Sequence, residues 1–213
     1  MGNTIEATGP LPHGDSSPLV VNSRERIEES YGDYLSDESR YGPAEADRLI
    51  IARDEAQVAD ALVAAADAGV NVTVSAGRTG IVGGAVPAGG VLLSLSDMKR
   101  VLGVRRLPDG RFTVRVEPGL SVAELRERLL TKNLGIERSA AGAQVDLEAF
   151  LADDRTFFYP PDPTEDTAHL GATVATNASG ARSYRYGATR RHVHGLRVVL
   201  TTGDVVAIER GAC

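Results

Sequence analysis

The strongest chemical signal in this sequence is a glycine-rich segment, Val74–Gly84. Its glycines are Gly77, Gly80, Gly83 and Gly84. Glycine is retained at such density where the backbone must adopt a positive φ or approach another group closely, because each glycine loses much conformational entropy on folding. Consecutive backbone N–H groups in such a segment can point into one concavity and bind an anion such as a pyrophosphate. Ser75 and Thr79 could add hydroxyl donors, and Arg78 could add a charged one.

The spacing of these glycines excludes two common nucleotide-binding motifs. The dinucleotide fingerprint needs G-x-G-x-x-G at the start of a helix, whereas this segment reads G-x-x-G-x-x-G-G and continues into Pro87 and a predicted strand. The phosphate loop of nucleoside triphosphatases needs a lysine, and no lysine lies between Val74 and Met98. The alternative is a flexible turn without function, but long glycine-rich connections are more often functional. We therefore predict an anion-binding loop.

The elements that position this loop follow from hydrophobic periodicity and capping residues. Arg48–Ala52 is predicted to be a buried strand, followed by a helix whose capping box is Asp54 with Gln57. Asn71–Ser75 is the next predicted strand, and Val91–Leu95 follows the loop as a third. The first two strands and their helix predict a parallel, right-handed β-α-β unit that presents the loop.

The rest of the chain predicts an α+β fold with two lobes: a small β-α-β lobe and a larger lobe with a mixed or antiparallel sheet and helices. A short helix is expected within 24–34, a helix from Ser121 to about Lys132 ending at Asn133 or Gly135, and a small-residue helix or turn at 171–177. Hairpins are expected at 101–104 with 112–116 and at 196–200 with 205–208. Residues 137–155 give no clear assignment. The predicted organisation is an arm and lead-in at 1–43, of which 1–22 are a polar arm, and one domain at 44–213 with lobes at about 44–96 and 97–213.

Composition excludes several classes of function. The net charge of −6 argues against a nucleic-acid partner, which would require clustered Lys and Arg. No window approaches the roughly 20 apolar residues that a membrane helix needs. Cys213 is the only cysteine, which excludes an internal disulfide and favours a reducing compartment. Together with an N-terminus that lacks a signal peptide, this predicts a cytoplasmic protein, or one peripheral to the inner face of the membrane.

Metal binding is not predicted. His192 and His194 are two residues apart and would share one face of a strand, but a metal site needs a third ligand. The other histidines are His13 and His169.

Three stretches, in order and at the right spacing, resemble one known family. VTVSAGRTGIVGGAVP resembles the pyrophosphate loop of the FAD-binding domain of the vanillyl-alcohol-oxidase or p-cresol-methylhydroxylase (PCMH) type. It is most similar to the branch of FAD-linked oxidases that contains the glycolate oxidase FAD subunit, D-lactate dehydrogenase and D-2-hydroxyglutarate dehydrogenase, where the loop typically reads P-R-G-G-N-T-G-L-V-G-G. TVRVEPGLSVAELRERL and YPPDPTEDTAHLGATVATNASGARSYRYGATRRHVHGLRVVLTTGDVV resemble later parts of that domain, and YLSDESRY resembles the lead-in of some members. The family residues at Val74, Ser75, Ala76, Arg78, Ala172 and Ser179 are replaced here.

The resemblance implies that FAD lies extended between the two lobes with its pyrophosphate on the glycine loop. The cofactor-binding residues that it implies are Ser75, Ala76, Gly77, Arg78, Thr79, Gly80, Gly83, Gly84, Pro161, Asp162, Pro163, Gly171, Ala172, Asn177, Gly180, Tyr186 and Gly187. Those from Pro161 onward would line the flat ring system, the ribityl chain and the adenine. The alternative for the small residues of Gly171–Gly180 is tight helix packing. Some members bind the flavin covalently through a histidine at the position of Arg78, so non-covalent FAD is expected here.

The resemblance further implies hydride transfer to FAD from a 2-hydroxy acid such as D-lactate or glycolate, with an iron–sulfur or quinone-linked electron acceptor. The substrate-binding cap domain and the catalytic base of the family lie C-terminal to the matched region. Because the chain stops directly after a predicted strand, we expect a fragment of a longer protein and predict no catalytic residue. Glu117, Glu165 and Asp166 have no spacing that gives them an acid–base role. Three alternatives remain open: an FAD-binding module or subunit without turnover, an NADPH-dependent flavin reductase of the cell-wall sugar-nucleotide type, and a domain whose glycine-rich turn binds nothing.

Overall fold

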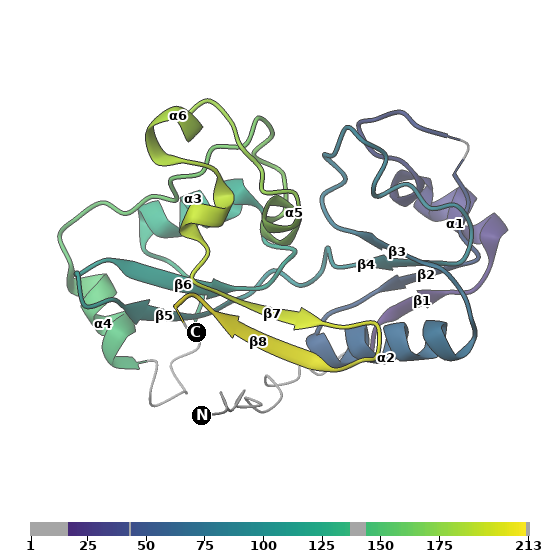
Figure 1. Ribbon diagram of the computed structural model, residues 1–213, viewed down its shortest axis with the longest axis horizontal. Coiled ribbons are helices and arrows are strands. Elements are labelled where there is room, and N and C mark those ends of the chain that lie inside the picture. The colour runs from purple at the N-terminus through teal and green to yellow at the C-terminus, as the bar shows by residue number, and fades with distance from the viewer. Residues whose placement is uncertain (1–16, 43, 137–143, 212–213) are drawn as a thin grey trace. The chain divides into compact units, whose positions relative to one another are not determined.

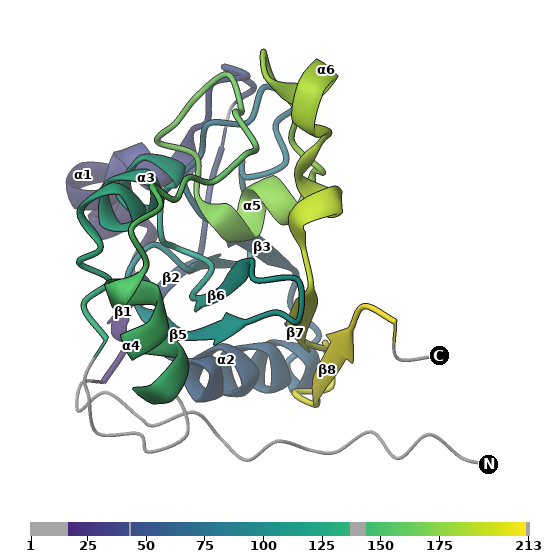
Figure 2. The ribbon, with the colours of Figure 1, turned by 90° about the vertical axis from the view of Figure 1, so that its left-hand side faces the viewer.

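The computed structural model describes residues 17–42, 44–136 and 144–211, which form two units. Within this described part, the first unit contains residues 17–98 and 193–211, and the second contains residues 99–192 (Figures 1 and 2). The pattern of the sequence predicted residues 193–213 in the second lobe. In the structure, the hairpin in this segment packs on a helix of the first unit instead. The first unit is therefore assembled from two stretches of chain that lie far apart in the sequence.

A four-stranded sheet forms the centre of the first unit. Its strands are, in spatial order, β1 (Leu19–Val21), β2 (Arg48–Ile51), β4 (Val91–Ser94) and β3 (Val72–Ser75). Strands β2, β4 and β3 are parallel, which confirms the direction predicted for the β-α-β unit, and β4 lies between the other two. The prediction that residues 1–22 form only a polar arm is wrong at 19–21, because β1 pairs antiparallel with β2.

Helices cover both faces of this sheet (Figure 1). On one face, α2 (Glu55–Asp67) buries Val58 against strand residues that include Leu93. On the other, α1 (Arg24–Tyr31) buries Ile27 against Leu49 and Leu92, and η1 (Gly32–Leu35) continues the chain after it. Consecutive residues of a strand face opposite sides, so a sheet covered on both faces needs continuous apolar runs such as LII in β2 and VLL in β4. The predicted helix start is confirmed, since the Asp54 side chain accepts from the Gln57 N–H.

The predicted C-terminal hairpin is confirmed as β7 (Gly195–Val199) paired with β8 (Val205–Glu209). It packs against α2 through an ion pair between Arg197 and Glu55, whose side chains are only 14% and 15% exposed. At the turn, Gly203 has φ +84°, and a Cβ there would lie 2.5 Å from Val63 of α2. Val199 joins the apolar cluster beneath α2. These contacts explain why the hairpin belongs to the first unit.

The second unit is built around a pair of antiparallel strands. Its elements are β5 (Val101–Arg106), β6 (Phe112–Val116), α3 (Val122–Thr131), α4 (Gln144–Ala152), α5 (Leu170–Ala175), α6 (Ser183–Tyr186) and η2 (Thr189–His192). The capping box of Ser121 with Glu124 is confirmed. Helix α3 ends at Thr131, close to the predicted Lys132. The residue that caps it is Lys132, with φ +55°, and not the predicted Asn133 or Gly135. Helix α4 lies in the segment that gave no assignment, and its Phe150 is fully buried at the centre of this core.

Candidate functional site

The glycine loop leaves the sheet at the carboxyl end of β3 and returns through Pro87 to β4. Because β2, β4 and β3 are parallel, their carboxyl ends meet at one edge of the sheet, where open parallel sheets bind ligands. The loop has no helix or strand of its own. Its middle is exposed, with Ile81 at 77% and Val82 at 84%. The fold therefore presents this loop to a ligand rather than burying it.

The backbone of this loop has a run of unused hydrogen-bond donors. Within the described residues, the N–H groups of residues 76–85 donate to no backbone or side-chain acceptor. The next N–H, that of Val86, donates to the Gly83 carbonyl at 3.1 Å. None of residues 76–85 is buried, so these N–H groups are accessible to a ligand. Several such N–H groups in succession can form a concavity that suits an anion.

The glycines of the loop differ in the structural reason for which glycine is required. Gly83 has φ +74°, so it provides a backbone conformation that other residues rarely adopt. A Cβ at Gly84 would meet nothing within 4 Å, and φ there is not positive. Neither backbone strain nor internal packing therefore explains the glycine at Gly84. The open space over it is what close approach by a ligand would require.

Arg78 brings a positive charge to the same loop. Its guanidinium carbon lies 4.4 Å from the centroid of the Tyr34 ring, and its Nη1 donates to the Ala76 carbonyl at 3.3 Å. Within the described residues it makes no ion pair with a carboxylate. An arginine held on an aromatic ring without an anionic partner can offer its charge to a bound phosphate.

The Ser75 hydroxyl is a buried polar atom at the start of the loop. The residue is 1% exposed, and its Oγ has no hydrogen-bond partner among the described residues. Buried hydroxyls usually have a partner, and a phosphate oxygen on the loop would supply one. The residues of the loop thus fit a pyrophosphate-containing ligand in three respects: unpaired N–H groups, an uncompensated cation and an unpartnered hydroxyl.

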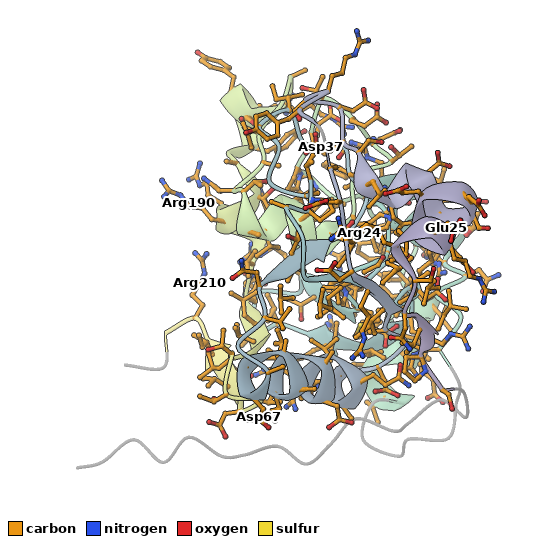
Figure 3. All side chains as sticks on the ribbon, turned by 90° about the vertical axis from the view of Figure 1, so that its right-hand side faces the viewer. Arg24, Glu25, Asp37, Asp67, Arg190 and Arg210 are labelled. Atoms are coloured by element: carbon orange, nitrogen blue, oxygen red, sulfur yellow. The ribbon has the colours of Figure 1, made fainter. Side chains whose placement is uncertain are left out.

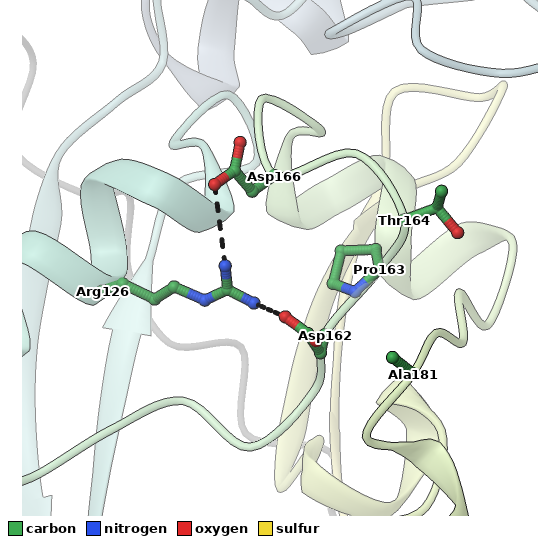
Figure 4. Close-up of a pocket in the computed structure, with 6 residues that line it drawn as sticks. All are labelled: Arg126, Asp162, Pro163, Thr164, Asp166 and Ala181. Carbon is green, nitrogen blue, oxygen red and sulfur yellow. Dashed lines mark hydrogen bonds and ion pairs between the residues drawn. The ribbon is translucent and has the colours of Figure 1, made fainter.

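Among the later predicted residues, Asp162 forms the centre of a charged cluster in the second unit. Its Oδ1 accepts from Arg182 at 2.8 Å. It also accepts from Arg126, whose Nη1 lies 3.7 Å from Asp166 Oδ2 (Figure 4). The hydrogen bond from Arg182, together with a weaker contribution from Arg126, holds the pKa of the Asp162 carboxyl below its usual value. A pocket of about 330 Å³ opens here. Its lining residues are Arg126, Asp162, Pro163, Thr164, Asp166 and Ala181.

The small residues of this group serve the packing of the chain itself. A Cβ at Gly180 would overlap the carbonyl oxygen of Asp162, and one at Gly171 would lie 2.5 Å from the Cβ of Pro118. This favours the alternative reading, tight packing, for these two glycines. Their contact with a flavin stays a prediction.

The remaining predicted residues occupy the turns and helices beside them. Asn177 has φ +49°, and its Oδ1 accepts from the Arg190 N–H at 3.0 Å. Gly187 also has a positive φ, +87°. Tyr186 contacts Phe158 edge to face, with centroids 5.6 Å apart, and Ala172 is half-buried in α5. The predicted residues from Pro161 onward thus all lie in the second unit, and their contact with a cofactor stays a prediction.

One segment that contacts the glycine loop was not among the predicted site residues. The lead-in segment, Tyr34–Tyr41, lies along the loop: the Glu38 N–H donates to the Arg78 carbonyl at 3.3 Å, and a Cβ at Gly83 would lie 3.4 Å from the Cβ of Tyr41. The segment has no periodic pattern, so only its resemblance to a family lead-in pointed to it.

Glu117 and His192, two of the residues considered earlier, have structural partners. Glu117 is 3% exposed and accepts three hydrogen bonds from Arg100, through the backbone N–H and the guanidinium. The Nε2 atom of His192 lies 3.0 Å from the Tyr186 carbonyl oxygen. In the part of the chain that the structure describes, no three His, Cys, Asp or Glu side chains are grouped to hold a metal ion. His13 and Cys213 lie outside that part.

Replacing Asp162 by asparagine tests the charge at this centre. We expect Asp162→Asn to lower the free energy of unfolding at pH 7 by about 1–2 kcal/mol, because two charge-assisted hydrogen bonds weaken at a partly exposed site. The folded-state pKa is lowered, so this contribution is complete above the unfolded pKa of about 3.9 and is lost as the pH falls through the folded value. Urea unfolding at pH 7, pH 5 and pH 3 should show the difference from the natural protein shrinking only at the lowest pH. Asp154→Asn, at an exposed position in the same unit, is the control, and a difference that does not depend on pH would contradict the assignment.

Comparison with known proteins identifies the family to which this chain is similar. The family described as FAD binding domain matches residues 46–144 and 138–209. D-lactate dehydrogenase from Anaerostipes hadrus is 34% identical over 178 residues, which cover 83% of this chain and 32% of that protein. The glycolate oxidase subunit from Bacillus subtilis is 26% identical over 162 residues, covering 75% of this chain and 29% of that one. The chain thus spans about a third of the length of the curated relatives that it matches.

Solved structures show the same fold. The structure of 6-hydroxy-D-nicotine oxidase from Arthrobacter nicotinovorans superposes with a TM-score of 0.65 at 16% identity, over 90% of this chain and 36% of that one. The predicted α+β fold class is confirmed. None of the described helices is long and apolar enough to cross a membrane. Since the family match extends over most of residues 46–209, this chain belongs to the FAD-binding domain family, as its glycine loop and the two later stretches predicted.

Proposed function

We propose that this chain binds FAD non-covalently and forms the FAD-binding part of an oxidoreductase that oxidises a 2-hydroxy acid. The observation that carries the proposal is the run of unpaired N–H groups at residues 76–85, at the carboxyl edge of a parallel sheet. Relatives named D-lactate dehydrogenase and glycolate oxidase subunit support the substrate class, because lactate and glycolate are both 2-hydroxy acids.

In this proposal the chain supplies binding and orientation. The N–H groups of the loop bind the pyrophosphate, Arg78 adds charge, and the Ser75 hydroxyl adds a hydrogen bond. Residues of the second unit, from Pro161 to Gly187, line the rest of the cofactor. Bound FAD supplies the acceptor for the hydride that leaves the substrate. Non-covalent binding is proposed because an arginine occupies position 78, and a guanidinium does not form the flavin bond that a histidine makes in some family members.

The rest of the proposal concerns the protein to which this domain belongs. We propose an iron–sulfur or quinone-linked electron acceptor and a cytoplasmic location, or one at the inner face of the membrane. The domain proposed to bind FAD is residues 44–213, and a cap domain that binds the substrate would lie outside the sequence described here.

Titration of FAD into purified chain tests the binding proposal. We expect flavin fluorescence to be quenched with a stoichiometry of one FAD per chain. Acid precipitation should then leave all the flavin in the supernatant, because no covalent bond holds it. A chain that binds no added FAD would contradict the proposal, and flavin that stays with the precipitate would contradict only its non-covalent part.

Anaerobic reduction of the holoprotein tests the activity. We expect D-lactate, glycolate or a related 2-hydroxy acid to bleach the flavin absorbance of a protein that contains this domain, and NADPH to leave it unchanged. Bleaching by NADPH alone would favour the flavin reductase. Bound FAD that neither reductant bleaches would favour a binding module without turnover.

A further inference from the structure

The lead-in segment Tyr34–Tyr41 contains one carboxylate that is incompletely bonded. The Oδ1 atom of Asp37 accepts from the Ser39 N–H at 2.9 Å and from the Ser39 hydroxyl. The other oxygen, Oδ2, is buried and has no hydrogen-bond partner among the described residues. An unpaired buried carboxylate oxygen is unfavourable, because desolvation of a charged group is not compensated.

This unpaired oxygen lies beside the unpaired donors of the glycine loop. A Cβ at Gly80 would lie 4.0 Å from Asp37 Oδ2, and residues 76–85 all have free N–H groups within the described structure. Figure 3 shows Asp37 in the loop that connects the first helix to the sheet. Two deficits of opposite kind, an acceptor without donors and donors without an acceptor, are therefore neighbours. A small movement of the loop would satisfy both.

The surrounding contacts hold the segment in place for such a bond. The Ser39 hydroxyl, itself bonded to Asp37, accepts from the Tyr41 N–H at 3.1 Å. Tyr41 packs on Gly83, and the Glu38 N–H is bonded to the Arg78 carbonyl. The segment contacts the loop on both sides of Gly80, so Asp37 lies opposite the part of the loop that it would bind.

We propose that Asp37 is a positioning residue for the phosphate site. Its Oδ2 accepts a hydrogen bond from the N–H of Gly80 or Ile81 when the loop closes on its ligand, which leaves the other N–H groups of the loop directed at the pyrophosphate. The inference rests on the proposed function, because the ligand that closes the loop is the pyrophosphate of FAD. Exclusion of water by the closed loop strengthens the bond.

The direction of the effect separates this role from a simple charge effect. A carboxylate near a pyrophosphate repels it, so neutralising Asp37 should tighten FAD binding if charge alone mattered. If Asp37 instead orders the loop, neutralising it should weaken FAD binding. Asparagine can keep one oxygen on Ser39, but it then presents an amide NH₂ to the N–H donors of the loop, where an acceptor is required.

The experiment compares Asp37→Asn, Asp37→Ala and Asp37→Glu with the natural chain. We expect the Kd for FAD to rise about tenfold or more in the first two variants, the effect of one charge-assisted hydrogen bond, and to be largely restored in the glutamate variant, which keeps the acceptor. Hydrogen–deuterium exchange should show that FAD protects the amides of residues 76–85 in the natural chain and in Asp37→Glu. The Asp37→Asn variant, saturated with FAD, should lose that protection around Gly80.

Asp33→Asn is the matched control, because Asp33 is an exposed carboxylate of the same region, and its Kd should be unchanged. Tighter or unchanged FAD binding by Asp37→Asn, with normal loop protection, would overturn the role of Asp37 and leave the proposed function standing. If Asp37→Asn fails to fold, loss of affinity in a folded Asp37→Glu variant would overturn the role equally. Failure of the natural chain to bind FAD would overturn both.

Discussion

Replacing Gly180 by alanine should lower the free energy of unfolding of the second unit by about 3 kcal/mol. The added Cβ would overlap the Asp162 carbonyl oxygen and would lie 2.7 Å from its carbon and 3.1 Å from the Cα of Pro163. The obstacle is backbone, and Pro161 and Pro163 fix φ on both sides of Asp162, so this turn cannot move aside easily. Arg126 and Arg182 restrain it further through the Asp162 carboxylate.

Thermal and urea unfolding of the purified variant measure this effect. A loss of 3 kcal/mol corresponds to a decrease in Tm of roughly 6–12 °C for a chain of this length. Gly103→Ala is the matched control, because Gly103 lies in the same unit and a Cβ there would meet nothing within 4 Å. If the two variants were equally stable, the close packing of Gly180 on Asp162 would be wrong.

Replacing Gly84 by valine should weaken FAD binding about 100-fold without destabilising the chain. The Cβ position is open and φ is not positive, so the folded protein can accept the side chain. A bound pyrophosphate would meet that side chain as it approached the loop. Loss of two hydrogen bonds to a charged group, each worth about 1.5 kcal/mol, corresponds to this change in Kd.

Fluorescence titration with FAD and unfolding of the FAD-free chain should be measured on the same preparations. Gly32→Val provides the comparison, since Gly32 is equally open, lies in the same unit and is outside the loop. Its Kd should match that of the natural chain. Normal FAD affinity in Gly84→Val would remove Gly84 from the site, whereas a fall in the Tm of the FAD-free variant would show that internal packing explains this glycine.

Local signals in the sequence were sufficient for most elements. The capping boxes at Asp54 and Ser121 predicted both helix starts, because a cap is a contact between residues three apart. Helix α4 was missed because it has no comparable pattern: Val145 and Leu151 are apolar yet exposed, so apolar residues do not mark a single face.

Features that depend on distant residues could not be predicted in this way. The insertion of β4 between β2 and β3 depends on strand pairing. The place of the hairpin in the first unit depends on Arg197 and Glu55, which are 142 residues apart in the sequence. The local sequence around Arg197 or Glu55 does not predict that the two residues form an ion pair.

The candidate site shows the same division. Residue type and spacing predicted a site at the glycine loop, and the family match supports FAD as the cofactor of the domain. The sequence could not show why each glycine is present, because it does not distinguish a glycine that leaves room for a ligand from one that tight packing requires. Only the atoms near each Cβ position separate Gly84 from Gly180. Asp37 was missed because its significance is an unpaired oxygen, which no sequence pattern records.

The discontinuity of the first unit also bears on the order in which the protein folds during synthesis. Residues 17–98 leave the ribosome first, but the hairpin that covers α2 follows only after residues 99–192 have been made. The second unit is continuous and can form while the nascent chain is still growing, ahead of the unit that precedes it. Until residues 193–211 emerge, Glu55 lacks Arg197 and the α2 surface lacks Val199. Completion of the N-terminal unit therefore waits for the last part of this sequence to be translated.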